Sequence, residues 1–398
     1  MITVEEANQI VLSNCIDFGI EEIPLFEAMG RILREPIVAD RDFPPYDRVT
    51  MDGIAIRYED FQKGQRQFEV KGMAVAGSPQ QNFTESGICT EIMTGAILPT
   101  GLDTVIRYED VEISDGLATI NVDEIREKQN IHFKGEDRKQ GDQILSPGKR
   151  LSSSEIGVCA TVGKSTIKVS RLPKVIIIST GDELVEIDQQ PLPHQIRRSN
   201  VYRLKTALEN HQIKVETDHI DDDYEMLLER LARHLDTYDV VLLSGGVSMG
   251  KFDYLPKALE ALGVMKLFHK IKQRPGKPFW LGRKDDTMVF AFPGNPVSSF
   301  MCSQRYFVPW LHASLKSDPT PEPIAVLTEN VQFKPELTYF IVVKLSYSER
   351  GELLATPLPG HGSGDLANLV DGDAFLELPS ERDEFKKGEA FRLIVYRS

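Results

Sequence analysis

The spacing of hydrophobic positions changes along the chain and divides it into segments of different predicted structure. Residues 3–18 carry apolar side chains every three or four positions, which predicts an amphipathic helix, and Thr3 with Glu6 predicts a capping box at its start. Residues 68–131 consist of short runs typical of β-strands separated by turns, which predicts a small β-rich domain. Residues 153–162 predict a further helix.

From residue 174 onward, strand-like and helix-like patterns alternate. Residues 175–179 form a continuous apolar and β-branched run, as expected for a strand that is buried on both faces. Further strands are predicted at residues 213–215, 239–243, 277–282 and 288–292, and helices at residues 200–211, 224–235, 255–262 and 297–311. This alternation predicts a doubly wound parallel sheet, in which ligands lie beyond the carboxyl ends of the strands.

The last part of the chain, residues 324–398, returns to β-type patterns, and its roughly five strands predict a small β-barrel or sandwich. The predicted fold class is therefore a multidomain α/β protein with a doubly wound domain, a β-rich N-terminal insertion and a C-terminal β-barrel domain. The predicted domains are a discontinuous N-terminal domain (1–40 and 138–172), the inserted domain (41–137), the α/β domain (173–316) and the C-terminal domain (317–398).

Composition narrows the class of protein further. The chain carries 46 Lys and Arg against 60 Asp and Glu, a net charge of −14, which argues against a nucleic-acid partner. No apolar run approaches the ~20 residues of a membrane span, and the N-terminus lacks the pattern of a signal peptide, so we expect no membrane association and a cytoplasmic location. Four dispersed cysteines and eight scattered histidines lack the spacing of zinc ligands, so we expect reduced, mostly buried thiols.

Three predicted strands of the α/β region end in loops that are rich in glycine, hydroxyl and carboxylate groups, at residues 179–183, 244–248 and 293–299. Because the carboxyl ends of parallel strands lie on one edge of the sheet, we expect these loops to meet in a crevice that binds an anion, in part through backbone N–H groups. The predicted ligand-binding residues of these loops are Thr180, Gly181, Ser244, Gly245, Gly246, Ser248, Pro293, Gly294, Asn295 and Ser298.

Positive charge is predicted to come from a separate element, residues 273–278. Arg274 and Lys277 flank a turn that its prolines make rigid, and both side chains can reach an oxyanion such as molybdate or phosphate. A solvated hairpin is the alternative interpretation of the same residues.

Carboxylates close to the predicted anion crevice indicate a divalent cation. Glu183, Asp222 and Asp253 would repel a phosphate ligand unless a cation such as Mg²⁺ lies between them, so we expect these three residues to be metal ligands. Residues 221–223 are also consistent with a simple helix N-cap, and that alternative covers at least one of the three aspartates.

Two short sequences have competing interpretations. Residues 245–251 fit the first seven positions of a P-loop, but Phe252 stands where the Mg²⁺-binding Ser or Thr is required, which argues against an ATP-hydrolysing enzyme. Asp52 precedes Gly53, where the backbone can approach a ligand closely, but an ordinary Asp-Gly turn would have the same sequence.

Six motifs follow one another along the chain: PPYDRVTMDGIAIR, EIMTGAILPTG, STGDEL, SGGVSMGKFDY, RPGKP and FPGNPVSS. In this order and spacing they resemble the MoeA/gephyrin E-domain family of molybdopterin molybdenumtransferases, and the resemblance extends over essentially the whole chain. It implies that the protein is a transferase of the last step of molybdenum cofactor biosynthesis. In that Mg²⁺-dependent step, adenylylated molybdopterin and molybdate give molybdenum cofactor and AMP.

The resemblance also implies roles for individual residues. Asp52, Thr94 and Asp137 match functional positions in the N-terminal half of the family. The matching catalytic carboxylates of the α/β domain are Glu183, Asp222 and Asp253, and the matching cationic pair is Arg274 and Lys277. The sulfur ligands of molybdenum would come from the dithiolene of the substrate. One departure is at Ala367 and Asn368, where many relatives carry two serines.

Partners follow from the same resemblance. The family is homodimeric, which implies that Asp52 and Thr94 face the α/β site of the other protomer, and a molybdopterin adenylyltransferase is the expected donor of the substrate. The alternative function is a gephyrin-like scaffold that binds peptides without catalysis, which would be expected to carry an additional fused domain and a long linker.

Overall fold

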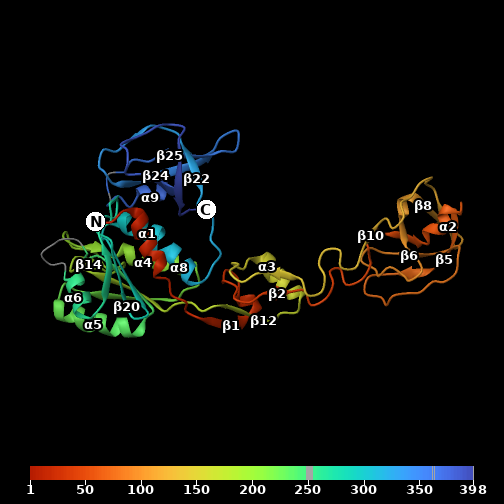
Figure 1. Ribbon diagram of the computed structural model, residues 1–398, viewed down its shortest axis with the longest axis horizontal. Coiled ribbons are helices and arrows are strands. Elements are labelled where there is room, and N and C mark those ends of the chain that lie inside the picture. Colours follow the sequence, from red (N-terminus) through yellow and green to blue (C-terminus); the bar gives the residue numbers. More distant parts are fainter. Residues whose placement is uncertain (248–253, 361, 363, 398) are drawn as a thin grey trace. The chain divides into compact units, whose positions relative to one another are not determined.

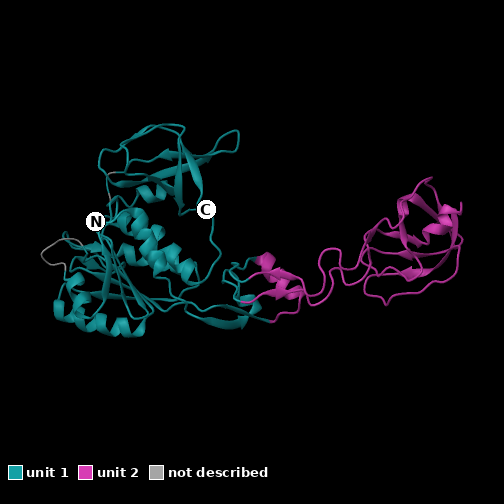
Figure 2. Cartoon of the chain, viewed as in Figure 1, with its two compact units in different colours: residues 1–34, 147–152, 166–398 teal, residues 35–146, 153–165 magenta. Residues whose placement is uncertain are grey.

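The computed structural model describes residues 1–247, 254–360, 362 and 364–397. The chain forms two compact units, which are coloured separately in Figure 2. The first unit contains Met1–Arg34, Pro147–Ser152 and Thr166–Ser398, and the second contains Glu35–Ser146 and Ser153–Ser165. Both units are therefore assembled from segments that are not consecutive in the sequence.

A six-stranded sheet with the strand order β16-β13-β17-β21-β20-β18 forms the centre of the first unit. Its strands are β13 (Val175–Thr180), β16 (Val215–Ile220), β17 (Val240–Ser244), β18 (Met265–His269), β20 (Trp280–Lys284) and β21 (Thr287–Phe292). The first four strands of the order are parallel, as predicted, whereas β20 and β18 are antiparallel to their neighbours. The connection from Lys284 to Thr287 is a tight turn with Asp285 at a φ of 50°, and so short a connection permits only an antiparallel pair.

Helices cover both faces of this sheet (Figure 1). On one face, α1 (Val4–Ser13) and α4 (Ser199–Glu209) pack against a core that includes Ile177 and Leu242. On the other face, α5 (Tyr224–Thr237) and α6 (Leu255–Ala261) pack against Ile176, Ile178 and Leu243. Successive residues of one strand point to opposite faces, so the continuous apolar runs of the sequence are buried on both sides.

Two predicted helices differ from the observed ones by more than two residues at one end or in continuity. The capping box of Thr3 and Glu6 is present, but α1 ends at Ser13, where the side chain of Asn14 donates a hydrogen bond to the carbonyl oxygen of Ile10 at 2.8 Å. The segment predicted as a single helix over 297–311 consists of α7 (Pro296–Cys302), a π-helical segment (Ser303–Phe307) and α8 (Val308–Ser314). Pro309 lacks the N–H that a continuous α-helix requires, which explains the irregular turns before it.

The C-terminal part of the first unit is a closed five-stranded barrel, which confirms the predicted β-domain. Its strands are β22 (Ile324–Leu327), β24 (Thr338–Tyr347), β25 (Leu353–Pro357), β26 (Ala374–Leu378) and β28 (Ala390–Val395), and the helix α9 (Asn368–Asp371) precedes β26. The pairing of β24 with β26 closes the barrel. The two-residue strand β19 (Gln273–Arg274) extends this sheet by pairing with β24.

The second unit contains a mixed sheet in the order β7-β4-β6-β5-β9-β8, which confirms a β-rich region. Its strands are β4 (Gly53–Ile56), β5 (Gln67–Ala74), β6 (Ile88–Ile92), β7 (Thr104–Arg107), β8 (Val111–Ser114) and β9 (Leu117–Ile120). The helices of this unit are α2 (Tyr58–Gln62) and α3 (Ser153–Thr161). The strand β4, which lies between β7 and β6, is buried on both faces, because Ile54 and Ile56 belong to one apolar cluster and Ala55 to another.

Short paired strands complete the two units. They are β1 (Ile20–Pro24) with β12 (Thr166–Ser170), β2 (Ile37–Val38) with β11 (Gln143–Leu145), β3 (Arg48–Val49) with β10 (Ile131–His132), β14 (Leu184–Val185) with β15 (Ile196–Arg197), and β23 (Val331–Gln332) with β27 (Glu384–Phe385). Single 3₁₀ turns occupy Leu25–Glu27 and Tyr108–Asp110.

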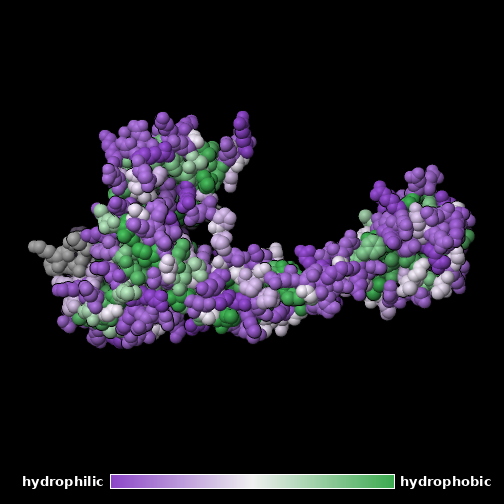
Figure 3. All heavy atoms as spheres, in the orientation of Figure 1, coloured by the Kyte–Doolittle hydropathy of each residue, from purple (hydrophilic) through white to green (hydrophobic). Residues whose placement is uncertain are grey.

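Hydrophilic residues cover most of the face seen in Figure 3, with hydrophobic residues in smaller groups between them. Within the described residues, no helix is both long enough and apolar enough to cross a membrane.

Candidate functional site

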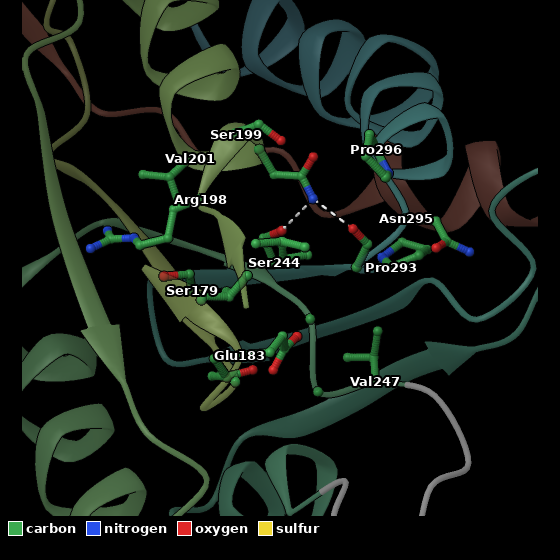
Figure 4. A pocket seen from close by; sticks show the side chains of 18 of the residues that line it. Ser179, Glu183, Arg198, Ser199, Val201, Ser244, Val247, Pro293, Asn295 and Pro296 are labelled. Atoms are coloured by element: carbon green, nitrogen blue, oxygen red, sulfur yellow. Dashed lines mark hydrogen bonds between the residues drawn. The ribbon is translucent and has the colours of Figure 1, made fainter. Parts of the chain in front are cut away.

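Three loops at the carboxyl ends of β13, β17 and β21 line one cavity of about 510 Å³, which we call the loop cavity (Figure 4). Its walls include Thr180, Gly181 and Glu183 from the first loop, Ser244, Gly245, Gly246 and Val247 from the second, and Pro293, Gly294, Asn295 and Pro296 from the third. The meeting of these loops at one sheet edge was predicted from the strand pattern and is confirmed. Parallel β13, β17 and β21 are in register, so their ends coincide.

The glycine pair after β17 is required by close packing. Gly245 and Gly246 have φ values of 104° and 68°, which favour glycine. A Cβ atom on Gly246 would lie 2.9 Å from Thr180 Oγ1, and one on Gly245 would lie 3.0 Å from the carbonyl oxygen of Thr180. The N–H of Gly245 donates to the carbonyl oxygen of Phe292 at 3.1 Å, so this donor, which was expected to face the ligand, stabilises the sheet edge instead.

A buried hydroxyl in the loop cavity lacks a protein partner. Thr180 is 8% exposed, and its Oγ1 has no hydrogen-bond partner in the described part of the chain. A buried polar atom without a partner is energetically unfavourable, and a polar ligand in this cavity can supply the partner.

Asn200 is a residue of the loop cavity that the sequence analysis did not identify. It lies in the first turn of α4, and its Nδ2 donates to the carbonyl oxygen of Gly294 at 2.7 Å and to Ser244 Oγ at 3.0 Å (dashed lines in Figure 4). The amide therefore connects the loop after β17 to the loop after β21. The sequence predicted only a helix start at this position, because the contacts depend on how α4 packs against the sheet.

Two further arginines beside the loop cavity were also missed. Arg198 is 6% exposed and pairs with Glu186, and its Nη2 donates to the carbonyl oxygen of Asp218 at 3.3 Å. Arg197 also lines the cavity, and its Nε donates to the carbonyl oxygen of Gln189 at 3.2 Å. Two arginines are thus present beside the loop cavity, where the sequence analysis predicted glycines, hydroxyls and carboxylates.

The predicted carboxylates partly converge. Glu183 and Asp222 both line the loop cavity, and the backbone N–H of Asp222 donates to Asp182 Oδ1 at 2.8 Å. Asp223 is the N-cap of α5, because its side chain accepts a hydrogen bond from Met226 N at 2.7 Å, so the N-cap alternative is confirmed for that residue. Asp253 and Ser248 lie outside the described residues. Across the ranges that are described, no three His, Cys, Asp or Glu side chains form a metal-binding group.

Arg274 and Lys277 line a second cavity of about 560 Å³, which we call the cation cavity. It shares Pro278, Pro293 and Asn295 with the loop cavity, so the two are neighbours. Ser298, predicted to bind the ligand with the loop residues, lines only the cation cavity. The C-terminal barrel contributes a further part of the wall, with Leu337, Tyr339, Phe340, Ile341 and Val342.

The turn between Arg274 and Lys277 is fixed by contacts with buried side chains. Gly276 has a φ of 89°, and a Cβ atom there would lie 2.5 Å from Cys302 Sγ. The buried amide of Gln273 donates to the carbonyl oxygen of Gly276 at 3.0 Å and accepts a hydrogen bond from the hydroxyl of Tyr306. Burial raises the pKa of the Cys302 thiol, consistent with the expected structural, reduced cysteine. The turn is therefore a packed structure and differs from a solvated hairpin.

Asp52, Thr94 and Asp137 belong to the second unit. Asp52 Oδ1 accepts hydrogen bonds from the backbone N–H of Thr94 at 2.6 Å and from its hydroxyl at 2.7 Å, and these bonds lower the pKa of Asp52. Gly53 begins β4, where a Cβ atom would lie 1.8 Å from the carbonyl oxygen of Ile106, so the Asp-Gly sequence has a packing cause in addition to any turn preference.

Asp137 is positioned by a histidine of the same unit. Arg48 Nη2 lies 3.2 Å from His132 Nδ1, and because an arginine can only donate, Nδ1 is the acceptor. His132 Nε2 then carries the proton and donates to Asp137 Oδ1 at 2.9 Å. The sequence placed Asp137 in a charged turn but did not reveal this chain of contacts.

Comparisons with known proteins find matches to one family along nearly the whole chain. The MoeA N-terminal region (domain I and II) matches residues 2–163, a probable molybdopterin binding domain matches residues 176–313, and the MoeA C-terminal region (domain IV) matches residues 325–396. A protein of Synechocystis named molybdopterin molybdenumtransferase is 40% identical over 395 residues, which cover 98% of this chain and 99% of the relative. The chain belongs to the MoeA family.

Other MoeA relatives support the same assignment. A molybdopterin molybdenumtransferase of Staphylococcus epidermidis is 31% identical and covers 100% of this chain and 96% of the relative. The crystal structure of a molybdopterin biosynthesis MoeA protein from Pyrococcus horikoshii has a TM-score of 0.83 and 31% identity, with both chains covered completely. The predicted family and fold class are therefore confirmed, and this MoeA-family chain is a transferase with a role in molybdenum cofactor biosynthesis.

Proposed function

We propose that this chain inserts molybdenum into molybdopterin, using adenylylated molybdopterin and molybdate as substrates and releasing molybdenum cofactor and AMP. The observation that carries the proposal is the pair of neighbouring cavities. One presents hydroxyls, carboxylates and a close backbone turn, and the other presents Arg274 and Lys277. The names of the relatives at 40% and 31% identity support the choice of this reaction.

The loop cavity suits the phosphate-linked part of the substrate. Its volume of about 510 Å³ lies within the range of cavities that bind small organic ligands. Thr180 and Ser244 can hydrogen-bond phosphate oxygens, and the glycine pair allows the ligand to approach the backbone. Buried hydroxyls that lack a protein partner, such as that of Thr180, gain one when the ligand binds.

Magnesium fits the acidic side of the same cavity. Glu183 and Asp222 line it together, and carboxylate oxygens are the ligands that Mg²⁺ prefers. In our proposal these two residues hold the ion, with Asp253 as the third ligand. When bound, Mg²⁺ would offset the negative charge of the phosphates and polarise the anhydride. Without the ion, Glu183 and Asp222 would repel the substrate that the neighbouring hydroxyls attract.

The cation cavity is the proposed entry point of molybdate. Arg274 and Lys277 lie on a turn fixed by the buried Gln273 and by Gly276, so their backbone positions are set before the oxyanion arrives. Fixed cations of this kind stabilise an oxyanion without reorganisation. Because the two cavities share Pro293 and Asn295, substrates bound in them as proposed would lie next to each other.

A direct assay tests the reaction. Purified protein is incubated with adenylylated molybdopterin, molybdate and Mg²⁺, and AMP is quantified by chromatography while the cofactor is detected by reconstitution of a molybdenum-free apoenzyme. We expect AMP and active cofactor to form together and both to disappear when EDTA removes Mg²⁺. Absence of both products in the complete mixture would contradict the proposed function.

The proposal includes a cytoplasmic homodimer that receives its substrate from a molybdopterin adenylyltransferase. In this dimer Asp52 and Thr94 of one protomer serve the α/β site of the other, as the resemblance implies. Mixing an inactive Asp52→Asn protein with an inactive Asp222→Asn protein should restore about a quarter of the activity, because half of randomly mixed dimers contain one intact site. A mixture that stays inactive, although mass measurements show exchanged dimers, would contradict this arrangement.

A further inference from the structure

We propose that Arg203 and Asn200 are positioning residues that make the hydroxyl of Ser244 a hydrogen-bond donor to the phosphate bound in the loop cavity. This inference rests on the proposed function, because it names how that site recognises the anion. It begins with a chain of hydrogen bonds in which Arg203 Nη2 donates to Asn200 Oδ1 at 3.1 Å, and Asn200 Nδ2 donates to Gly294 O and Ser244 Oγ.

The orientation of the Asn200 amide is fixed from two sides. The guanidinium of Arg203 has only donors, so the amide atom that faces it must be the oxygen. The carbonyl of Gly294 is only an acceptor, so the amide atom that lies 2.7 Å from it must be the nitrogen. Both constraints select the same orientation, and a flipped amide would face each partner with the wrong atom.

Fixing the amide also fixes the role of Ser244. With Asn200 Nδ2 as donor at 3.0 Å, Ser244 Oγ is the acceptor of this bond, and its own hydrogen points elsewhere. Ser244 is 4% exposed and lines the loop cavity, and among the described residues its hydroxyl hydrogen has no acceptor. A buried hydroxyl that has already accepted one bond and still carries its proton is suited to donate to an oxyanion.

The guanidinium of Arg203 orients the Asn200 amide without being paired to a carboxylate in the described residues. It forms no ion pair with any described residue, its Nε has no hydrogen-bond partner, and its Cζ lies 4.9 Å from the centre of the Phe300 ring. Burial lowers the pKa of Arg203 to about 10, so it remains charged and remains a donor at neutral pH. A carboxylate beside it would compete with Asn200 for its donors.

Ligand recognition follows from this arrangement. Thr180 and Ser244 then present hydroxyl groups to the same cavity, and neither is occupied as a donor by the protein in the described residues. Such a wall favours an ionised phosphate oxygen over a group that must itself donate. An aspartate at position 200 would reverse this preference, because Ser244 would donate to the new carboxylate and lose its hydrogen for the ligand.

Equilibrium binding of AMP, the proposed product, and of molybdopterin separates this role from a structural one. We expect Ser244→Ala and Asn200→Asp each to weaken binding by about tenfold or more, as for the loss of a hydrogen bond to a charged group. Arg203→Met, which keeps the packing on Phe300, should weaken binding severalfold in the wild-type background and have no further effect in the Ser244→Ala background. Lys205→Met, on the same helix, is the control and should bind as the wild type does.

The outcomes distinguish the positioning role from the proposed function. Independent, additive effects of Arg203→Met and Ser244→Ala, or wild-type binding by Asn200→Asp, would overturn the positioning role, with thermal unfolding confirming that the variants are folded. If the variants show the expected differences in AMP binding but the wild-type protein releases no AMP from adenylylated molybdopterin, only the proposed function is overturned. Wild-type protein that binds neither AMP nor molybdopterin would overturn both.

Discussion

The loop cavity and the cation cavity share Pro278, Pro293 and Asn295 but differ in the chemistry of their other walls. The loop cavity collects hydroxyls, glycines and the carboxylates Glu183 and Asp222, all from the α/β sheet edge. The cation cavity combines Arg274 and Lys277 with apolar strand residues of the C-terminal barrel. Arg197 and Arg198 also line the loop cavity, but Arg198 is paired with Glu186. In the proposed function, the carboxylates of the loop cavity would therefore bind Mg²⁺, and Arg274 and Lys277 would attract the second anion.

The largest expected effect is in the loop cavity. Asp222→Asn should lower the rate of AMP release by about a hundredfold or more, because it removes a proposed Mg²⁺ ligand whose stabilisation is worth several kcal/mol. Asp223→Asn is the matched control, because asparagine also caps a helix and this side chain bonds only to the start of α5 in the described structure. Equal losses in both variants would contradict a special role for Asp222.

A steric change in the loop cavity should have the next largest effect. Gly246→Ala places a Cβ atom 2.9 Å from Thr180 Oγ1 at a φ of 68°, so we expect a loss of unfolding free energy of about 1–3 kcal/mol and strongly weakened AMP binding. Urea unfolding and calorimetric titration measure the two effects. Gly263→Ala is the control, because Gly263 also has a positive φ but nothing lies within 4 Å of its Cβ position. Unchanged AMP binding in Gly246→Ala would argue that the ligand does not approach this turn.

Removing a cation tests the other cavity. Lys277→Met should raise the KM for molybdate by about tenfold while leaving kcat at saturating molybdate and AMP affinity close to their original values, since one hydrogen bond to a charged group is lost. Steady-state kinetics at varied molybdate concentrations provide the measurement. An equal loss of AMP affinity would show that the two cavities do not bind separate anions.

The smallest effect concerns Tyr339, which lines the cation cavity. Burial raises the pKa of this phenol, and Arg274 opposes the increase. Arg274→Met should therefore raise the pKa of Tyr339 further, by less than about one unit, as measured by ultraviolet difference titration of matched Tyr339→Phe proteins. Since the folded state favours the neutral phenol, Tyr339 supports stability below its unfolded pKa of about 10 and loses this contribution at higher pH.

The sequence predicted the loop cavity better than the cation cavity, for a physical reason. Parallel strands bring their ends together, so the positions of Thr180, Ser244 and Gly294 follow from the strand pattern alone. Arg274 and Lys277 could be identified as cations from the sequence. The cavity that they line, however, depends on the pairing of β19 with the C-terminal barrel, and local sequence patterns do not encode a pairing between such distant segments.

Asn200 and the helix interruptions show the same limit at the level of single residues. Asn200 looked like an ordinary helix start, because its contacts with Ser244 and Gly294 arise from tertiary packing. The apolar periodicity of residues 297–311 continued through the π-helical segment, so only Pro309 signalled an interruption. Glu183 and Asp222 were predicted to lie in one crevice, and both line the loop cavity. Their role as metal ligands stays a prediction.

The two-residue strand β19 gives the cationic pair an unequal attachment. Arg274 is paired in register with Tyr339 of the barrel, whereas the carbonyl of Lys277 accepts a bond from Ile271 N in the α/β part of the unit. Because the turn between them is packed on Gln273 and Cys302, the two residues keep their backbone spacing and connect the barrel to the sheet. An oxyanion bound by both residues would bridge the barrel and the sheet. Its binding in the cation cavity would therefore make the first unit more rigid.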